Sequence, residues 1–181
     1  DGKWTEEKKK RIRDSRVEGT ALMAAAMARQ SPRPKVVICA SAIGYYGDRG
    51  DTILREDAPQ GSGFLAEVCG DWERAAAQLP DLGVRTAHLR FGLVLSGKGG
   101  AMDKMLPIFK KGLGGRLGTG NQYMSWVSVR DVVKAIRHVL HRNTLSGPIN
   151  ITAPEPVTNA LFTRTLGKAL NRPALLPAPA F

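Results

Sequence analysis

The alternation of helical patterns with short apolar runs most restricts the fold of this 181-residue chain. Residues 36–40, Val-Val-Ile-Cys-Ala, form a continuous apolar run typical of a strand buried on both faces, as in parallel sheets. Apolar residues at helical spacing precede this run over residues 6–29, and another helix is predicted at about 63–79. Strands that alternate with such helices predict right-handed βαβ units and a doubly wound α/β sheet.

The remainder of the chain continues the same alternation. A strand is predicted at 85–95, and it is followed by the glycine loop 96–100. Helices are predicted at 102–111, 130–141 and 158–170, and short strands at 125–127 and 148–151. Thr5 and Thr158 are predicted helix N-caps, and Asp131 a carboxylate in the first turn of a helix. No Gly-X-Gly-X-X-Gly follows any predicted strand. We therefore expect a dinucleotide-type sheet that lacks its N-terminal glycine-rich βαβ half.

The charge balance and the cysteines exclude several functional classes. Lys and Arg outnumber Asp and Glu by 27 to 16, but the basic residues are densely clustered only at 8–13. This run is predicted to be a solvated helix face. No aromatic residues are interleaved with that run, so we expect no nucleic-acid partner. Cys39 and Cys69 lack metal-site or disulfide spacing, so we expect no metal. Because no apolar run reaches membrane-spanning length, we expect a cytoplasmic protein without a membrane partner.

Several short segments resemble a known enzyme group. They fall in the order of the landmarks of extended short-chain dehydrogenases/reductases, the nucleotide-sugar epimerase group: Arg16-Val17-Glu18-Gly19-Thr20, Ser41-Ala42-Ile43-Gly44-Tyr45-Tyr46-Gly47, Leu89-Arg90-Phe91-Gly92 and Trp126-Val127-Ser128-Val129-Arg130-Asp131-Val132. Rarer segments are similar to an atypical subgroup, the epimerase-family oxidoreductases sometimes labelled cell-division inhibitors: Trp4-Thr5-Glu6-Glu7-Lys8, Gly63-Phe64-Leu65-Ala66-Glu67-Val68-Cys69 and Asn150-Ile151-Thr152-Ala153-Pro154-Glu155-Pro156. This resemblance covers essentially the whole chain.

The resemblance implies a Rossmann-like fold that binds NADP(H) or NAD(H), with NADP(H) slightly favoured. The glycine-rich turn that would hold the pyrophosphate would lie upstream of Asp1. Residues 1–181 are therefore expected to form a partial NAD(P)-binding domain, in which the substrate-side segments occupy about 93–181.

The proton-transfer pair of the group, Tyr-X-X-X-Lys, is replaced here by Leu65 and Cys69. In the ordinary family the tyrosine exchanges a proton with the substrate oxygen, and the lysine lowers the tyrosine pKa from its usual value of about 10. Leu65 cannot transfer a proton. Cys69 is predicted either to contact the cofactor and act in catalysis or to be a buried, inert helix cysteine.

The other site candidates follow from their positions in the resembling segments. Ser41 stands where the group keeps a hydroxyl that binds the substrate carbonyl, although it could merely end the strand. Tyr45 or its neighbour Tyr46 could replace the lost acid, or both could serve only in packing. Arg16 stands where the group has an asparagine, and it could reach a phosphate or a carboxylate, or be a surface cation. Arg90 and Gly92 end the next strand, where Gly92 permits close approach of a ligand or marks a bend.

These residues give two expectations of function. The preferred one is a nicotinamide-dependent oxidoreductase or epimerase-like enzyme acting on a small or nucleotide-linked carbonyl or hydroxyl substrate, with a degenerate Tyr-Lys site. Its predicted catalytic residues are Ser41, Cys69 and Tyr45, and its cofactor-binding residues are Arg16, Ser41, Cys69, Arg90 and Gly92. The alternative is a non-catalytic NAD(P)-binding sensor or scaffold module. The expected partner is a small molecule, and a homodimer through helices 6–29 and 63–79 is possible.

Overall fold

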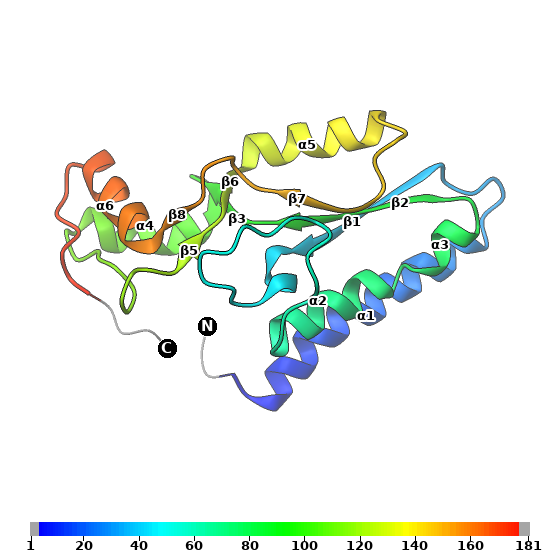
Figure 1. The fold of residues 1–181 in the computed structure, drawn as a ribbon, viewed down its shortest axis with the longest axis horizontal. Coiled ribbons are helices and arrows are strands. Elements are labelled where there is room, and N and C mark those ends of the chain that lie inside the picture. The colour runs from blue at the N-terminus through cyan, green and yellow to red at the C-terminus, as the bar shows by residue number, and fades with distance from the viewer. Residues whose placement is uncertain (1–3, 178–181) are drawn as a thin grey trace. The chain divides into compact units, whose positions relative to one another are not determined.

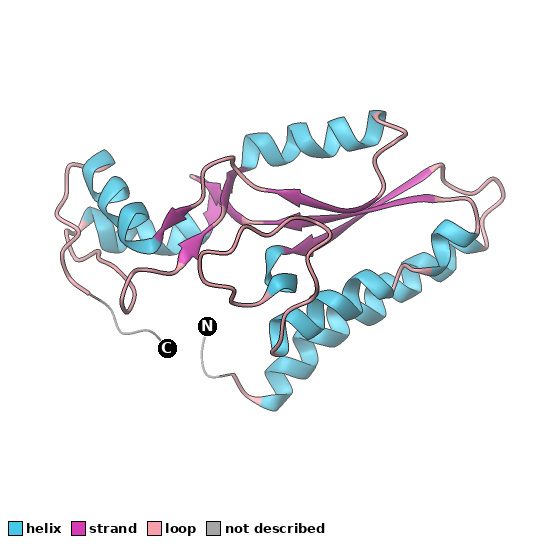
Figure 2. Cartoon of the chain, viewed as in Figure 1, coloured by secondary structure: helices cyan, strands magenta, loops and turns pink. Residues whose placement is uncertain are grey.

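The computed structural model describes residues 4–177. Its backbone contacts divide the chain into two compact units, Asp1–Phe91 with Ala135–Asn150, and Gly92–Lys134 with Ile151–Phe181. Figures 1 and 2 show the order of helices and strands in the chain.

The first unit is built on a sheet with the strand order β1-β2-β7, comprising β1 (Val36–Ala42), β2 (Arg85–Phe91) and β7 (Gly147–Ile151). β1 and β2 are parallel, and their register places Ser41 beside Arg90 and Cys39 beside His88. The other edge of β1 has no strand partner among residues 4–177. The predicted α/β class with a parallel sheet is thus confirmed, and the apolar run at 36–40 lies within β1.

Helices lie on both sides of this sheet. α1 (Glu6–Ala28), α2 (Phe64–Arg74) and α3 (Gln78–Asp81) lie on one side, and the C-terminal half of α5 (Val129–His141) lies on the other (Figure 1). α1 begins as predicted, because the Thr5 hydroxyl accepts a hydrogen bond from the Lys8 amide at 3.3 Å. The predicted helix at 63–79 is instead two helices. Pro80 has no N–H to donate to the Ala76 carbonyl, which accepts from the Leu79 amide at 3.1 Å.

The core of the first unit lies between the sheet and the α1–α3 side. Its buried members are Ala24 of α1, Val37 of β1 and Ala76, Leu79 and Val84 around α3. Burial of a side chain such as Leu79 stabilises the fold by roughly 1.5–3 kcal/mol. This packing fixes the helices over the parallel strands and so sets the position of every residue at the strand ends.

The second unit contains shorter strands. β3 (Leu93–Ser96) pairs in parallel with β6 (Trp126–Ser128) and antiparallel with β4 (Gly99–Gly100), and the remaining elements are β5 (Tyr123–Met124), β8 (Val157–Thr158), α4 (Ala101–Lys110) and α6 (Asn159–Ala169). The predicted strand at 85–95 is interrupted at Gly92. A Cβ added there would lie 2.4 Å from the Ser125 carbonyl oxygen, so the close backbone approach requires glycine.

The predicted helix starts in the second unit are confirmed. The Ser128 hydroxyl donates to the Asp131 carboxylate at 2.8 Å and accepts from the Asp131 amide at 3.1 Å. The Thr158 hydroxyl accepts from the Leu161 amide at 3.3 Å and caps α6. Across residues 4–177, none of the helices has the length and apolar character needed to cross a bilayer.

Candidate active site

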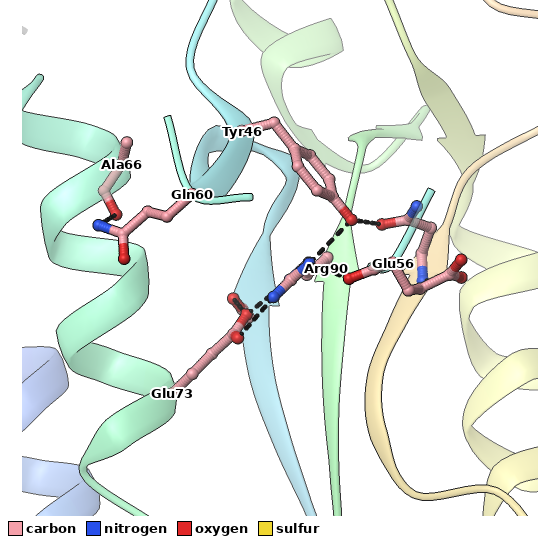
Figure 3. Close-up of polar contacts among 8 residues, drawn as sticks. Tyr46, Glu56, Gln60, Ala66, Glu73 and Arg90 are labelled. Atoms are coloured by element: carbon pink, nitrogen blue, oxygen red, sulfur yellow. Dashed lines mark hydrogen bonds and ion pairs between the residues drawn. The ribbon is translucent and has the colours of Figure 1, made fainter. Parts of the chain in front are cut away.

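The carboxyl ends of β1 and β2 carry a buried polar cluster around Arg90 (Figure 3). Arg90 of β2 donates from Nε and Nη2 to the two carboxylate oxygens of Glu73, on α2, at 2.8 and 2.9 Å. Ser41 of β1 donates to the same carboxylate at 2.7 Å. Arg90 and Ser41 are each 3% exposed. A bidentate pair of this kind fixes both the distance and the plane of the two groups.

The remaining guanidinium nitrogen of Arg90 binds the turn that follows β1. Nη1 donates to the hydroxyl of Tyr46 at 2.9 Å and to the carbonyl oxygen of Glu56 at 3.1 Å (Figure 3). Tyr46 closes η1 (Ile43–Tyr46) and in turn donates to the side-chain oxygen of Asn150 at 2.7 Å. The Asn150 amide donates to the Glu56 carboxylate at 2.9 Å. Arg90 therefore joins β2 to α2, η1 and the loop that contains Glu56.

The loop is also fixed to α2 at a second point. Gln60 donates from its side-chain amide to the carbonyl oxygen of Ala66 at 3.0 Å (Figure 3). A Cβ added to Gly70 would lie 2.3 Å from the Gln60 side-chain oxygen, so glycine leaves the room that Gln60 fills. The segment after β1 is therefore bound by Arg90 of β2 and, through Gln60, by α2.

The charges within this cluster are mutually stabilised. Burial lowers the pKa of Arg90, but the hydrogen bonds to Glu73 and Tyr46 outweigh it and raise that pKa above its ordinary value. Burial raises the pKa of Glu73, but the hydrogen bonds from Arg90 and Ser41 outweigh it and leave that pKa below its ordinary value. Both groups are therefore ionised at neutral pH.

His88 lies two residues before Arg90 on β2 and differs from its neighbours in having no partner for one ring nitrogen. Among the described residues, its buried Nδ1 makes no hydrogen bond. Burial lowers the pKa of His88, with the nearby Arg90 charge acting in the same direction and Glu73 opposing it. The imidazole is accordingly neutral at pH 7.

The structure brings Ser41 and Arg90 together, as the sequence predicted for residues at neighbouring strand ends. Their polar atoms, however, are directed at Glu73 rather than at an open surface. A substrate-orienting role for Ser41 and a cofactor-binding role for Arg90 stay predictions. In the folded chain both residues have an evident positioning function, because they hold α2 against the ends of the strands.

Cys69 and Leu65 lie against the turn after β1. A Cβ added to Gly44 would lie 3.6 Å from the Cys69 sulfur and 3.8 Å from the Leu65 Cβ. Burial raises the pKa of the Cys69 thiol, and the neighbouring Glu73 carboxylate raises it further. Cys69 is therefore a neutral thiol at pH 7, able to give a proton but poorly suited to act as a nucleophile.

Tyr45 sits directly above the buried cluster. Its ring centroid is 3.6 Å from the Arg90 guanidinium carbon and 5.4 Å from the ring of Tyr46, which it meets edge to face. Its hydroxyl makes no hydrogen bond to any of residues 4–177, whereas the Tyr46 hydroxyl is fully engaged. Of the two phenols, Tyr45 is thus the one left able to exchange a proton with a ligand.

Arg16 and Gly92 are not part of this cluster. Arg16 donates to the Ile12 carbonyl at 3.0 Å and lies 5.3 Å over the Trp72 ring, where it lines a pocket of about 310 Å³ together with Thr20 and Cys39. Gly92 belongs to the second unit, where it makes the bend described above. A cofactor-binding role for either residue stays a prediction.

Sequence reasoning missed two members of the cluster. Glu73 lies four residues after Cys69, so an acidic residue on the same face of α2 was the available signal. Asn150 lies 104 positions from its partner Tyr46, and no local pattern connects them. No group of three or more side chains that could hold a metal ion occurs within residues 4–177.

Sequence comparisons identify similar proteins. The sequence model described as "NAD dependent epimerase/dehydratase family" matches residues 1–152. The epimerase family protein MT2273 of Mycobacterium tuberculosis is 44% identical over 178 residues, which are 98% of this chain and 58% of that protein. The epimerase family protein SDR39U1 of Homo sapiens is 37% identical over 98% of this chain and 61% of its own length. The chain thus spans about three fifths of the relatives that it matches.

Comparison with solved structures also identifies epimerase-family proteins. The crystal structure of human epimerase family protein SDR39U1 with NADPH matches 98% of this chain with a TM-score of 0.93 at 36% identity, over 60% of that chain. A nucleoside-diphosphate sugar epimerase from Corynebacterium glutamicum matches 99% of this chain with a TM-score of 0.80 at 40% identity, over 40% of that chain.

Proposed function

Because this chain belongs to the NAD dependent epimerase/dehydratase family, we propose that the protein is an NADP(H)- or NAD(H)-dependent oxidoreductase or epimerase-like enzyme. Its substrate is a small or nucleotide-linked carbonyl or hydroxyl compound. The observation that carries the proposal is the position of the Arg90 cluster at the carboxyl ends of parallel strands, the edge where such sheets bind ligands. The similarity to a human protein crystallised with NADPH favours NADP(H).

The residues at this edge fit a flat nicotinamide ring. Gly44 has no side chain, and the neighbouring Leu65 is apolar, so the turn and the first turn of α2 leave an apolar surface. When bound, the cofactor would supply or accept a hydride. Ser41, Glu73 and Arg90 would hold that surface in place.

The proton must come from a group other than the usual tyrosine. We assign it to Tyr45, whose ring lies over Arg90 at this edge, or to Cys69, whose thiol stays protonated there. Leu65 in the usual tyrosine position makes the Tyr-Lys site degenerate. The replacement also supports a second candidate function, a non-catalytic NAD(P)-binding sensor or scaffold.

The test measures NADPH binding and NADPH consumption separately. The protein at its full natural length is titrated with NADPH and then supplied with a panel of aldehydes and ketones. An enzyme should consume NADPH, and Tyr45→Phe or Cys69→Ala should lower that rate by about 10²-fold or more, in keeping with the loss of a proton-transfer group. Binding without turnover of any compound would support the sensor. A protein that binds neither NADPH nor, in a parallel titration, NADH would overturn both functions.

A further inference from the structure

We propose that Arg90 is a positioning residue whose guanidinium plane fixes Tyr45 as the proton-transfer group of the site. The inference rests on the proposed function and chooses between its two proton-transfer candidates, Tyr45 and Cys69. The Tyr45 ring centroid lies 3.6 Å from the Arg90 guanidinium carbon, a separation at which two flat groups are in direct contact. Because Cys69 replaces the lysine of the usual Tyr-Lys pair, another side chain must hold the proton donor in place.

The plane of the Arg90 guanidinium is itself held on every edge. Nε and Nη2 donate to the Glu73 carboxylate at 2.8 and 2.9 Å, and Nη1 donates to the Tyr46 hydroxyl at 2.9 Å and the Glu56 carbonyl oxygen at 3.1 Å (Figure 3). A guanidinium donates along its edges, so these bonds fix its orientation and leave its flat face to a ring. Arg90 is 3% exposed, which leaves water little access to that face. The Tyr45 ring occupies it.

The contact supplies geometry rather than a free charge, because the Glu73 carboxylate compensates the Arg90 charge. Two further contacts restrict Tyr45. Its ring meets the Tyr46 ring at 87° with centroids 5.4 Å apart, and its carbonyl oxygen accepts from the Gly61 amide at 2.9 Å. The Tyr45 hydroxyl is therefore presented in one defined direction.

The hydroxyl distinguishes Tyr45 from a ring used only in packing. Phenylalanine would make the same ring contacts, yet the Tyr45 hydroxyl has no hydrogen-bond partner within the described part of the chain. Tyr45 is partly exposed, whereas Cys69 is 6% exposed and offers a ligand little surface. In reduction, the Tyr45 hydroxyl would give its proton to the substrate oxygen while the carbonyl carbon receives the hydride of the nicotinamide, and water would then return a proton to Tyr45.

The kinetic experiment follows NADPH consumption by the full-length protein with the aldehyde or ketone that it reduces fastest. Arg90→Lys keeps the positive charge but removes the planar face. It should lower kcat by about tenfold or more, because displacing a reacting group by about 1 Å can cost roughly 10²-fold. The KM values for NADPH and for the carbonyl compound should change by about twofold or less.

A double variant tests whether Arg90 acts through Tyr45. Tyr45→Phe alone should lower kcat by about 10²-fold. Adding Arg90→Lys to Tyr45→Phe should lower it no further, because the hydroxyl that Arg90 positions is already absent. The matched control is Val84→Ala, a truncation of a side chain 1% exposed that lies directly before the opposite end of β2. It should lower the urea midpoint but leave kcat unchanged, with or without Tyr45→Phe.

A spectroscopic measurement tests the ring contact without turnover. The Arg90 Nε–H signal is assigned by NMR from its loss in Arg90→Lys. The Tyr45 ring current should shift this signal upfield, because the guanidinium lies against the face of the ring. Tyr45→Leu should therefore move it downfield, and Tyr45→Phe, which keeps a ring, should leave it in place.

The outcomes separate this inference from the proposed function. Independent losses of kcat in the double variant, a raised KM with unchanged kcat in Arg90→Lys, or an Nε–H signal that Tyr45→Leu does not move would overturn the inference even if NADPH is consumed. Consumption that depends on Cys69 and not on Tyr45 would also overturn it and leave the proposed function intact. If neither NADPH nor NADH is consumed with any compound, the enzyme is overturned, and the positioning role with it.

Discussion

Glu73 on α2 holds Arg90 on β2 through two hydrogen bonds, one to each carboxylate oxygen, at 2.8 and 2.9 Å. The Arg90 side chain is 3% exposed and the Glu73 side chain 13% exposed. Removing one partner of a buried ion pair leaves the other charge without compensation, which costs about 3–5 kcal/mol. We therefore expect mutation of either partner to weaken the attachment of α2 to β2.

Glu73→Gln should lower the free energy of unfolding by about 3 kcal/mol, because Arg90 would remain buried with its charge uncompensated. Glu67→Gln on the same helix, where the side chain is exposed, should change it by less than about 0.5 kcal/mol. Urea denaturation of both variants measures the difference. Equal effects would show that the buried pair has no special role.

The same pair should make stability depend on pH in the acid range. The pKa of Glu73 is lowered in the folded chain, so its contribution is complete above the unfolded pKa, near the ordinary 4.5, and is lost as pH falls through the folded value. The gap in unfolding free energy between wild type and Glu73→Gln should accordingly narrow below about pH 4.5. Urea midpoints measured from pH 6 down to pH 3 test this, and a gap that widens on acidification contradicts it.

His88→Leu should stabilise the protein, most clearly in mild acid. The folded chain keeps the His88 pKa below its ordinary 6.5, so only the unfolded chain gains a proton as pH falls through that value. The free energy of unfolding of the wild type then falls by at most about 1.4 kcal/mol per pH unit. The His88→Leu variant has no such loss, because leucine does not titrate. Thermal melts at pH 7.5 and 5.5 should show a growing advantage for His88→Leu. The exposed His138→Gln is the control and should show none.

Tyr46→Phe should cost about 1–3 kcal/mol of stability, because it leaves Arg90 and Asn150 without their shared hydroxyl partner. Tyr45→Phe should leave stability nearly unchanged, since the Tyr45 hydroxyl makes no hydrogen bond within residues 4–177. The two variants are compared by denaturation and by NADPH consumption. A large stability loss from Tyr45→Phe would mean that its hydroxyl is structural.

Gly61→Ala should destabilise the loop after η1 strongly, because the added Cβ would lie 2.1 Å from the Tyr46 carbonyl oxygen. Gly19→Ala should have the opposite effect. It lies within α1 with no atom within 4 Å of the added Cβ, and alanine in a helix is favoured over glycine by roughly 0.5–1 kcal/mol. Thermal melting of both variants measures the two shifts, and a stable Gly61→Ala protein would contradict the close approach.

Local signals allowed much of the fold to be predicted from sequence. The caps at Thr5 and Thr158 and the apolar run of β1 are contained in a few consecutive residues, and each appears in the structure where expected. The break near Pro80 was missed because apolar periodicity continues through that position. A bend at Gly92 was one of its two interpretations, but the strand was predicted to continue through it to residue 95.

The polar cluster was harder to predict than the elements. Ser41 could be placed at a strand end, but its partner Glu73 lies 32 positions away and its identity depends on how α2 packs over the sheet. The connection from Tyr46 to Asn150 likewise forms only when the loop folds back beside β7. Tertiary hydrogen bonds of this kind have no signature in residue spacing.

The unpaired outer edge of β1 should make this chain prone to aggregation during preparation. Val36–Ala42 presents a row of amide and carbonyl groups with no strand partner among residues 4–177, and the strand is rich in valine, isoleucine and alanine. Such an edge is a template for intermolecular strand pairing, which can end in insoluble material. Yield and sample homogeneity should therefore improve with any extension, partner or charged edge substitution that blocks pairing at β1.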